Sequence, residues 1–343
     1  MSSKAPYDAT GIEFFDIPDF QFSNGHRQPI KLAYRSFNPA GTKGTVLIPT
    51  CYGGRINSTL NFTTGALQDY QVIVVAMLGN GESSSPSNDP AFPLTKPGPS
   101  VQYEDDVHAQ YQLVTERFGL QQLEAVIGFS MGGQQAYYWS VMHGSGPAPF
   151  LKNAVVICSS AKTSGHNYAF LEGPISALEV AGDYAGGAYR THGTKPREGL
   201  RAFGRAYAGW LTSAEWFRQE LWRKLGAASL QDWLHPEVAG YESWDAENLL
   251  ALARKWQGGD IGKVGGGGQG YEKALQGIQA RVLLMPSMTD QYFWWRDSER
   301  EMEHLQHGVF RPIDTAWGHI AGGGANPVDA KWIDGEIATF LKG

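Results

Sequence analysis

A serine flanked by glycines interrupts an apolar run in the sequence "AVIGFSMGGQQA", residues 125–136. Ser130 stands between Gly128 and Gly132 in the spacing Gly-x-Ser-x-Gly. A serine hydroxyl can attack a carbonyl carbon when a tight strand-to-helix turn exposes it, and small neighbours permit that turn. Because strand-like residues precede Ser130 and helix-like residues follow it, the sequence predicts a nucleophile at this position.

A nucleophilic serine needs a base that takes its proton and an acid that orients the base. In sheets of the hydrolase type these groups follow later strands, in the chain order Ser, Asp or Glu, His. Asp290 stands a few residues beyond the apolar run "VLLMP", and His319 follows the last strand-like segment in "AWGHIAGGG". We expect His319 to be the base and Asp290 the acid, meeting Ser130 above the carboxyl ends of the strands.

Two other aspartates compete with Asp290 for the acid role. Asp297 begins the next predicted helix and is expected to be its N-terminal cap, and Asp314 lies inside the last predicted strand. Asp290 is therefore the preferred acid.

An oxyanion hole requires two backbone N–H groups that point at the developing negative charge. Met131, directly after the nucleophile, is expected to supply one. The other is expected from "TCYGGR", residues 50–55, whose glycines let a backbone approach a substrate closely. Cys51 and Tyr52 both remain candidates, with Tyr52 preferred. No histidine is placed near Cys51 in the pattern, which favours a packed thiol over a second nucleophile.

The surrounding elements predict an α/β-hydrolase fold with a mostly parallel, doubly wound sheet. Continuous apolar runs at 44–50, 70–78 and 153–161 are typical of parallel strands covered on both faces. They alternate with helices expected at 57–70 and 100–119, the latter capped by Ser100 and ended by Gly119. Other expected elements are a hairpin over 12–37, a strand at 280–290, a helix at 298–308, a strand at 308–319 and a helix at 327–341.

Residues 163–275 break this alternation. The segment is rich in helix formers and tryptophan, has no clear buried strand, and ends in a glycine-rich stretch, 262–270, that is typical of a flexible loop. It is predicted to be a helical cap inserted into a catalytic domain formed by residues 1–162 and 276–343.

Composition excludes several classes of function. The chain has 343 residues, 42% of them hydrophobic, and a formal net charge of −6, so it offers no basic surface for nucleic acid or an anionic membrane. No secretory signal and no run of about 20 apolar residues is present, which predicts a cytoplasmic protein. Cys51 and Cys158 are expected to be reduced. Phosphate, dinucleotide and metal-binding motifs are absent, so neither a cofactor nor a metal is expected.

Four segments together resemble the homoserine O-acetyltransferase family of α/β-hydrolases: "YEDDVHAQYQLVTERFG", "AVIGFSMGGQQAYYWS", "SMTDQYFWW" and "FRPIDTAWGHIAGGG". The resemblance implies a triad of Ser130, Asp290 and His319, a ping-pong mechanism through an acyl-serine, and a homodimer built on the cap helices. It covers the catalytic domain and, in outline, the cap. The family contains acyltransferases and simple hydrolases.

Two departures from the family motifs bear on the choice between these activities. Phe129 stands where the transferases carry a second glycine, and "GHIAGGG" replaces their "GHDAFL". Homoserine-binding residues are not carried over, and Arg55 and Arg190 are the candidates for holding a carboxylate. The departures favour a serine hydrolase that cleaves a small-molecule carboxylic ester, such as an acetate.

Two alternatives remain. One is an O-acyltransferase that uses acetyl-CoA as co-substrate, and the other is a ligand-binding homologue without turnover, against which an intact triad argues.

Overall fold

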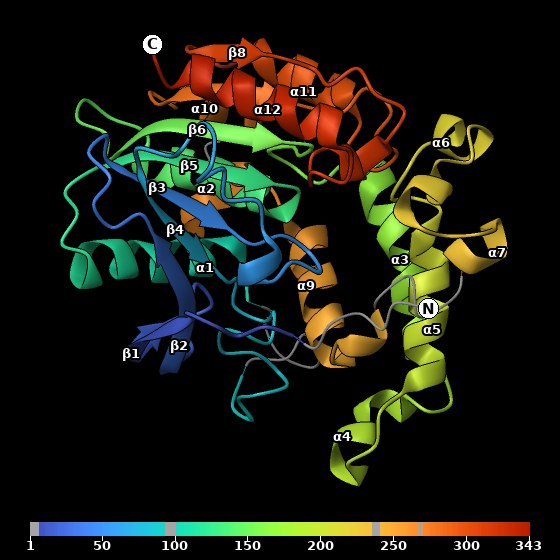
Figure 1. Cartoon of the computed structure of the whole chain (residues 1–343). Helices are drawn as coiled ribbons and strands as arrows, with labels where there is room; N and C mark the ends of the chain where they lie inside the picture. The colour runs from blue at the N-terminus through green and yellow to red at the C-terminus, as the bar shows by residue number, and fades with distance from the viewer. Residues whose placement is uncertain (1–6, 93–100, 235–240, 267, 269) are drawn as a thin grey trace.

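One eight-stranded sheet runs through the computed structural model, which describes residues 7–92, 101–234, 241–266, 268 and 270–343 (Figure 1). The order across the sheet is β1-β2-β4-β3-β5-β6-β7-β8. The first two strands form an antiparallel hairpin, β2 pairs antiparallel with β4, and every later pair is parallel. The strands are β1 Glu13–Gln21, β2 Arg27–Phe37, β3 Thr45–Pro49, β4 Gln71–Val75, β5 Leu123–Phe129, β6 Leu151–Ile157, β7 Arg281–Met285 and β8 Gly308–Phe310. The predicted mostly parallel α/β-hydrolase sheet is confirmed.

The central strands are buried on both faces, as their continuous apolar runs predict. All five residues of β3 are buried, and their side chains alternate between two separate apolar clusters. Leu47 joins the cluster on the side of α1 (Tyr103–Gln112) and α2 (Met131–His143), whereas Val46 and Ile48 join the cluster that contains α12 (Pro327–Phe340). Helices therefore cover both faces of the sheet.

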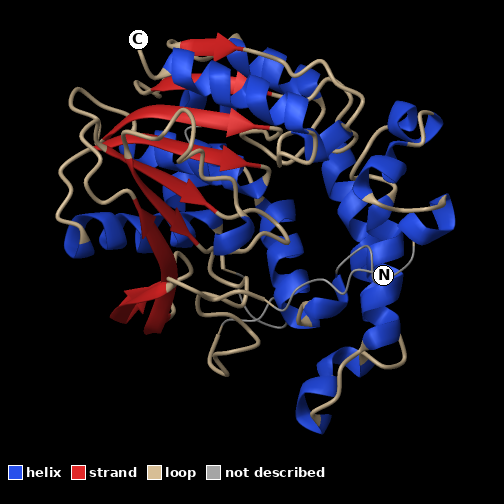
Figure 2. Cartoon of the chain, in the orientation of Figure 1, coloured by secondary structure: helices blue, strands red, loops and turns tan. Residues whose placement is uncertain are grey.

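A set of helices lies between β6 and β7 in the chain, and we call α3 to α9 the inserted helices. They are α3 Gly165–Glu179, α4 Tyr189–His192, α5 Arg197–Ala208, α6 Ala214–Arg218, α7 Leu230–Trp233 and α9 Ala246–Gly258. Figure 2 shows the arrowheads of the parallel strands pointing toward these helices. The inserted helices thus stand at the carboxyl edge of the sheet. After them come a 3-10 turn at Ile261–Gly266, within the segment expected to be a loop, and α10 (Tyr271–Gln276).

Three local predictions need correction. Residues 57–70 form turns after a short 3-10 helix, Ile56–Ser58, because their threonines, asparagines and glycine have weak helix propensity. The helix predicted at 298–308 is α11, Trp295–Met302. The last strand ends at Phe310, because Pro312 has no N–H for the ladder.

The helix predicted at 100–119 is α1 followed by a π-helical turn, Leu113–Arg117. Its N-terminal cap is Gln102, which shares a capping box with Asp105, whereas Ser100 lies outside the described residues. Gly119 adopts φ +65 just after the turn, in agreement with its predicted role as the end of the helix.

Candidate active site

Ser130 occupies the turn between β5 and α2. Its φ of 57° and ψ of −126° lie in a region that residues with a side chain rarely adopt. The surrounding hydrogen bonds hold this conformation: the Ser130 N–H donates to the Ile157 carbonyl at 2.9 Å, and the Ser130 carbonyl accepts from the Gly133 N–H at 2.8 Å. This is the strained strand-to-helix turn that presents a nucleophile at the edge of a sheet.

The glycines beside Ser130 are required by close backbone contacts. A Cβ atom at Gly128 would lie 1.9 Å from the carbonyl oxygen of Gly132. A Cβ atom at Gly132 would lie 2.7 Å from the carbonyl oxygen of Pro49, at the end of β3. The Gly-x-Ser-x-Gly spacing therefore reflects a steric requirement, and it also brings the start of α2 against the loop after β3.

Asp290 and His319 are hydrogen bonded to each other. Nδ1 of His319 lies 2.6 Å from Oδ2 of Asp290, and both side chains are almost completely buried. An ionised carboxylate only accepts hydrogen bonds, so Nδ1 carries the proton and Nε2 keeps its lone pair. Oδ1 of Asp290 accepts from the backbone N–H groups of Tyr292 and Phe293 at 3.1 and 3.0 Å, which fixes the carboxylate orientation.

Aromatic rings hold the imidazole of His319 beside the serine turn. The ring of Phe129, the residue before Ser130, has its centroid 4.7 Å from that of His319. Tyr292 and Phe293 contact the same imidazole at 4.3 and 5.6 Å between centroids. The structure therefore brings together Asp290, His319 and the residue that precedes Ser130.

The route to His319 differs from the prediction. The histidine does not directly follow the last strand, because β8 ends at Phe310 and His319 lies in a 3-10 helix, Gly318–Ala321. Between them the chain continues beside the loop after β7: Ile313 forms a bridge with Ser287, and the Gly318 N–H donates to Thr289 Oγ1 at 3.1 Å.

The rival aspartates occupy other places. Asp297 is not the N-terminal cap of α11, which is Trp294; it lies one turn inside the helix, 3.2 Å from Arg300. Burial raises the pKa of Asp297 above its ordinary value. Asp314 lies beyond β8 and not within a strand. Within the described residues, the carboxylate that is hydrogen bonded to His319 is that of Asp290.

The loop after β3 lies beside the start of α2, as an oxyanion hole requires. Met131 is the first residue of α2, so its N–H has no carbonyl partner within the helix. The side chain of Tyr52 reaches the inserted helices, where its hydroxyl donates to the Leu249 carbonyl at 3.0 Å and its ring stacks on Tyr207. This anchoring fixes the backbone on which the Tyr52 N–H is carried.

The two cysteines are unpaired in the structure. Burial raises the pKa of the Cys51 thiol to about 12 and that of the Cys158 thiol above its ordinary value. Since the thiolate is the reactive form of cysteine, these environments favour packed thiols over nucleophiles.

Two buried glutamines connect the helices to the oxyanion loop, and sequence reasoning missed both. Nε2 of Gln135 donates to the Thr50 carbonyl at 3.1 Å, and Oε1 of Gln135 accepts from Gln110 Nε2 at 2.7 Å. Oε1 of Gln110 accepts from Trp139 Nε1 at 2.7 Å. The available signal was the pair of glutamines in "GGQQAYYW", since polar side chains in a helix buried on every side need partners.

Arg55 and Arg190, the candidates for holding a carboxylate, both bind protein groups. Arg55 donates to the Asn80 carbonyl at 3.3 Å, and its guanidinium lies 4.0 Å from the ring centroid of Trp244. Arg190 donates to the Pro86 carbonyl.

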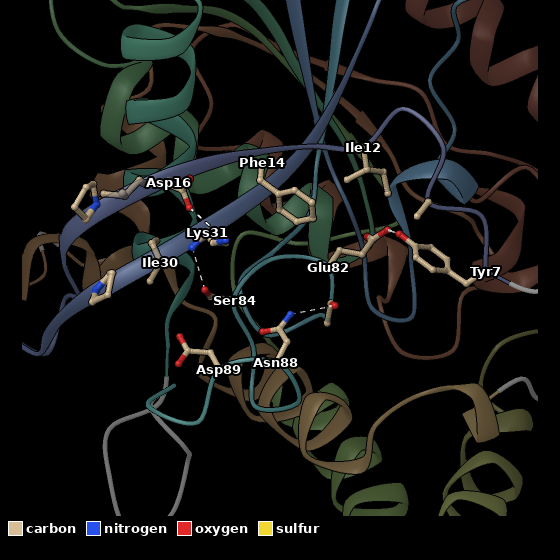
Figure 3. Close-up of a pocket in the computed structure, with 15 residues that line it drawn as sticks. Tyr7, Ile12, Phe14, Asp16, Ile30, Lys31, Glu82, Ser84, Asn88 and Asp89 are labelled. Atoms are coloured by element: carbon tan, nitrogen blue, oxygen red, sulfur yellow. Dashed lines mark hydrogen bonds and ion pairs between the residues drawn. The ribbon is translucent and has the colours of Figure 1, made fainter.

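A groove of about 560 Å³ lies along the β1–β2 hairpin, away from Ser130 and His319. Figure 3 shows Phe14 on one side of it and Glu82 at one end, with the Tyr7 hydroxyl hydrogen bonded to the Glu82 carboxylate. The groove is not lined by any of the candidate catalytic residues.

Comparisons with known proteins extend these observations. The profile of the alpha/beta hydrolase fold family matches residues 44–195. An ethyl acetate hydrolase of Pseudomonas veronii is 34% identical over 342 residues, covering 96% of this chain and 95% of that protein. A homoserine O-succinyltransferase of Ralstonia pickettii is 32% identical over 260 residues, covering 71% of this chain and 62% of that protein.

A crystal structure of an acetylester hydrolase from Corynebacterium glutamicum superposes with a TM-score of 0.88 at 29% identity, covering 97% of this chain and 96% of that one. The resemblance to homoserine acyltransferases and to hydrolases of the same fold is confirmed. Within the described residues, no helix combines the length and apolar character needed to cross a bilayer.

Proposed function

This chain belongs to the alpha/beta hydrolase fold family, and from that premise we propose that it is a serine hydrolase that cleaves carboxylic esters with a small acyl group, such as acetates. The observation that carries the proposal is the 2.6 Å hydrogen bond between His319 and Asp290, beside the strained turn at Ser130. A base oriented by a buried acid next to an exposed-turn serine is the arrangement that acyl transfer requires.

In the proposed mechanism, Oγ of Ser130 attacks the ester carbonyl carbon while Nε2 of His319 takes the hydroxyl proton. Asp290 stabilises the imidazolium that forms. The N–H groups of Met131 and Tyr52 bind the negative oxygen of the tetrahedral intermediate, and each such donor is worth about 3 kcal/mol in the transition state. His319 then protonates the departing alkoxide, which leaves as the alcohol. Water, deprotonated by His319, attacks the acyl-serine and releases the carboxylic acid.

We assign the inserted helices the role of a cap, within a segment of residues 163–275 set into a catalytic domain of 1–162 and 276–343. Support comes from the burial of Ser130 and His319 and from contacts between the two parts. Tyr52 stacks on Tyr207 of α5, and Tyr292 stacks on Phe170 of α3. A covered site strengthens the electrostatic interactions within it by excluding water.

An acyltransferase is the second candidate, supported by the similarity to homoserine O-succinyltransferases. The two activities share the acyl-serine and differ in whether water or another hydroxyl reaches it first. The transferase would take acetyl-CoA as its acyl donor.

Mass spectrometry after brief mixing with p-nitrophenyl acetate or with acetyl-CoA tests the proposal. We expect sustained release of p-nitrophenol by the wild type, none by Ser130→Ala, and no acetyl adduct from acetyl-CoA. Ser140→Ala is the matched control, because the Ser140 hydroxyl bonds only the Ala136 carbonyl within α2. An adduct from acetyl-CoA that alcohols discharge faster than water would establish the transferase instead. Silence with both donors would contradict both activities.

The unpaired Cys51 and Cys158 support a reducing compartment, and we propose that the enzyme works in the cytoplasm on a small-molecule ester. The homodimer implied by the family resemblance stays a prediction, which light scattering would test.

A further inference from the structure

An apolar pocket of about 190 Å³ adjoins the candidate active site. Its walls include Phe129, directly before Ser130, and Gly322, just after the helix that carries His319. Cys51 and Gly53, on either side of Tyr52, also line it. The remaining lining residues are Ile48, Pro49, Gly54, Ser58, Thr59, Leu60, Phe62, Ile127, Ile157 and Gly323. No charged side chain is among these described lining residues.

The pocket wall forms where Phe129 contacts the glycines after His319. A Cβ atom at Gly322 would lie 2.8 Å from the ring of Phe129 and 2.7 Å from Sγ of Cys158. A Cβ atom at Gly323 would lie 3.1 Å from the same ring. The two places where the sequence departs from the transferase motifs therefore touch each other, and the ring of Phe129 fills space that side chains after His319 would need.

We propose that this pocket binds the alkyl chain of the ester while Ser130 attacks its carbonyl carbon. The proposal rests on the proposed hydrolase function. A cavity of about 150 Å³ lined by leucine, isoleucine and phenylalanine takes up benzene, so a pocket of about 190 Å³ holds a chain of roughly six carbon atoms. An uncharged lining cannot compensate a buried carboxylate or ammonium group. The pocket thus selects neutral aliphatic esters and rejects substrates whose chain ends in a charge.

Leu60 is the best position for a test, because it lines the pocket from a partly exposed loop. Leu60→Trp fills the pocket and Leu60→Ala enlarges it. Leu120→Trp is the matched control, since Leu120 is also partly buried but directly precedes the amino-terminal side of β5, at the opposite edge of the sheet. Circular dichroism and thermal unfolding verify that each variant folds, and Leu60→Ala carries the test by itself if the tryptophan variant does not.

Two substrate series separate the two chains of an ester. The first is p-nitrophenyl esters from acetate to octanoate, which vary the acyl chain, and the second is alkyl acetates from methyl to octyl, which vary the alcohol. We expect kcat/KM of the wild type to rise about fourfold per methylene in one series until the chain fills the pocket. Leu60→Trp should abolish that rise, Leu60→Ala should extend it to longer chains, and Leu120→Trp should reproduce the wild type.

The responding series identifies which chain occupies the pocket. Chain-length profiles that are identical in Leu60→Trp, Leu60→Ala and the wild type, for both series, would overturn the pocket proposal while leaving the hydrolase intact. Failure of the wild type to hydrolyse any ester in either series would instead contradict the proposed function itself.

Discussion

Lys255 of α9 and Asp106 of α1 form a buried ion pair that ties the inserted helices to the sheet. Nζ of Lys255 lies 2.5 Å from Oδ2 of Asp106, and neither side chain is accessible to solvent. Lys255 also donates to the Leu78 carbonyl at 2.9 Å, and Oδ1 of Asp106 accepts the Leu78 N–H at 2.8 Å. Both charges are thus compensated at the end of the β4 segment.

Replacing Lys255 by methionine should lower the free energy of unfolding by about 3–5 kcal/mol, because the Asp106 carboxylate stays buried without its cation. Urea denaturation measures this loss. Lys162→Met is the control: Lys162 pairs with Asp260 at 3.1 Å but is half exposed, so its loss should cost under about 1 kcal/mol. Equal losses in the two variants would contradict a special role for the buried pair.

Replacing Gln135 by leucine should lower kcat by about tenfold to a hundredfold, because the oxyanion loop loses its tie to α2 and small displacements of catalytic groups are costly. Gln134→Leu removes an equally buried glutamine that bonds Tyr103 and Thr163 instead of the loop. Steady-state kinetics on folded protein should show a clearly smaller effect on kcat for Gln134→Leu. A similar fall in both variants would indicate general loss of packing rather than loop positioning.

Substitutions at Phe129 and Gly323 should compensate each other. Gly323→Ala alone crowds the Phe129 ring and should cost about 1–3 kcal/mol of stability, and Phe129→Ala alone should cost about 2–4 kcal/mol through lost packing. The double variant should be more stable than the sum of the single effects predicts, by about 1 kcal/mol. Chemical denaturation of the four proteins gives this coupling, and strict additivity would show that the two residues do not compete for space.

Acid should destabilise the fold partly through His143. Burial, and secondarily the neighbouring charge of His108, lowers the pKa of His143 from 6.5 to about 4, and its ring stacks on Tyr111 at 4.1 Å. Between pH 6.5 and 4 the unfolded chain binds a proton that the folded chain does not, so stability falls as pH falls through this window. His143→Phe keeps an aromatic ring but removes the proton site.

The wild type should lose about 2 kcal/mol more than His143→Phe between pH 7.5 and pH 5, as measured by urea denaturation at both pH values. The aromatic substitution keeps packing comparable, so the difference between the two pH values isolates the titration. Parallel losses in the two proteins would show that His143 is not responsible.

The strands and the Ser130 turn were predictable because local sequence dictates them. A strand covered on both faces must be apolar at every position, and β3, β4 and β5 have that pattern. The turn required Gly128 and Gly132 on steric grounds, so its motif is visible in the sequence. The pairing of Asp290 with His319 followed from chain order alone, since both come after later strands.

Features that depend on tertiary contacts were not predictable. The path from Phe310 to His319 is set by contacts with Thr289 and Ser287, which lie on a different loop. The tie from Gln135 to Thr50 spans 85 residues, and no local pattern specifies a glutamine's distant partner. The ring of Phe129 and the glycines after His319 likewise make sense only as a pair in space.

Placing the inserted helices between β6 and β7 has a consequence for synthesis of the protein. The ribosome completes Ser130 and its turn long before it reaches His319, and at 5–20 residues per second the interval is roughly ten to forty seconds. During that time the nascent chain holds a nucleophile without the base or acid that would activate it. The reactive serine therefore stays inert toward cellular esters until translation is nearly complete.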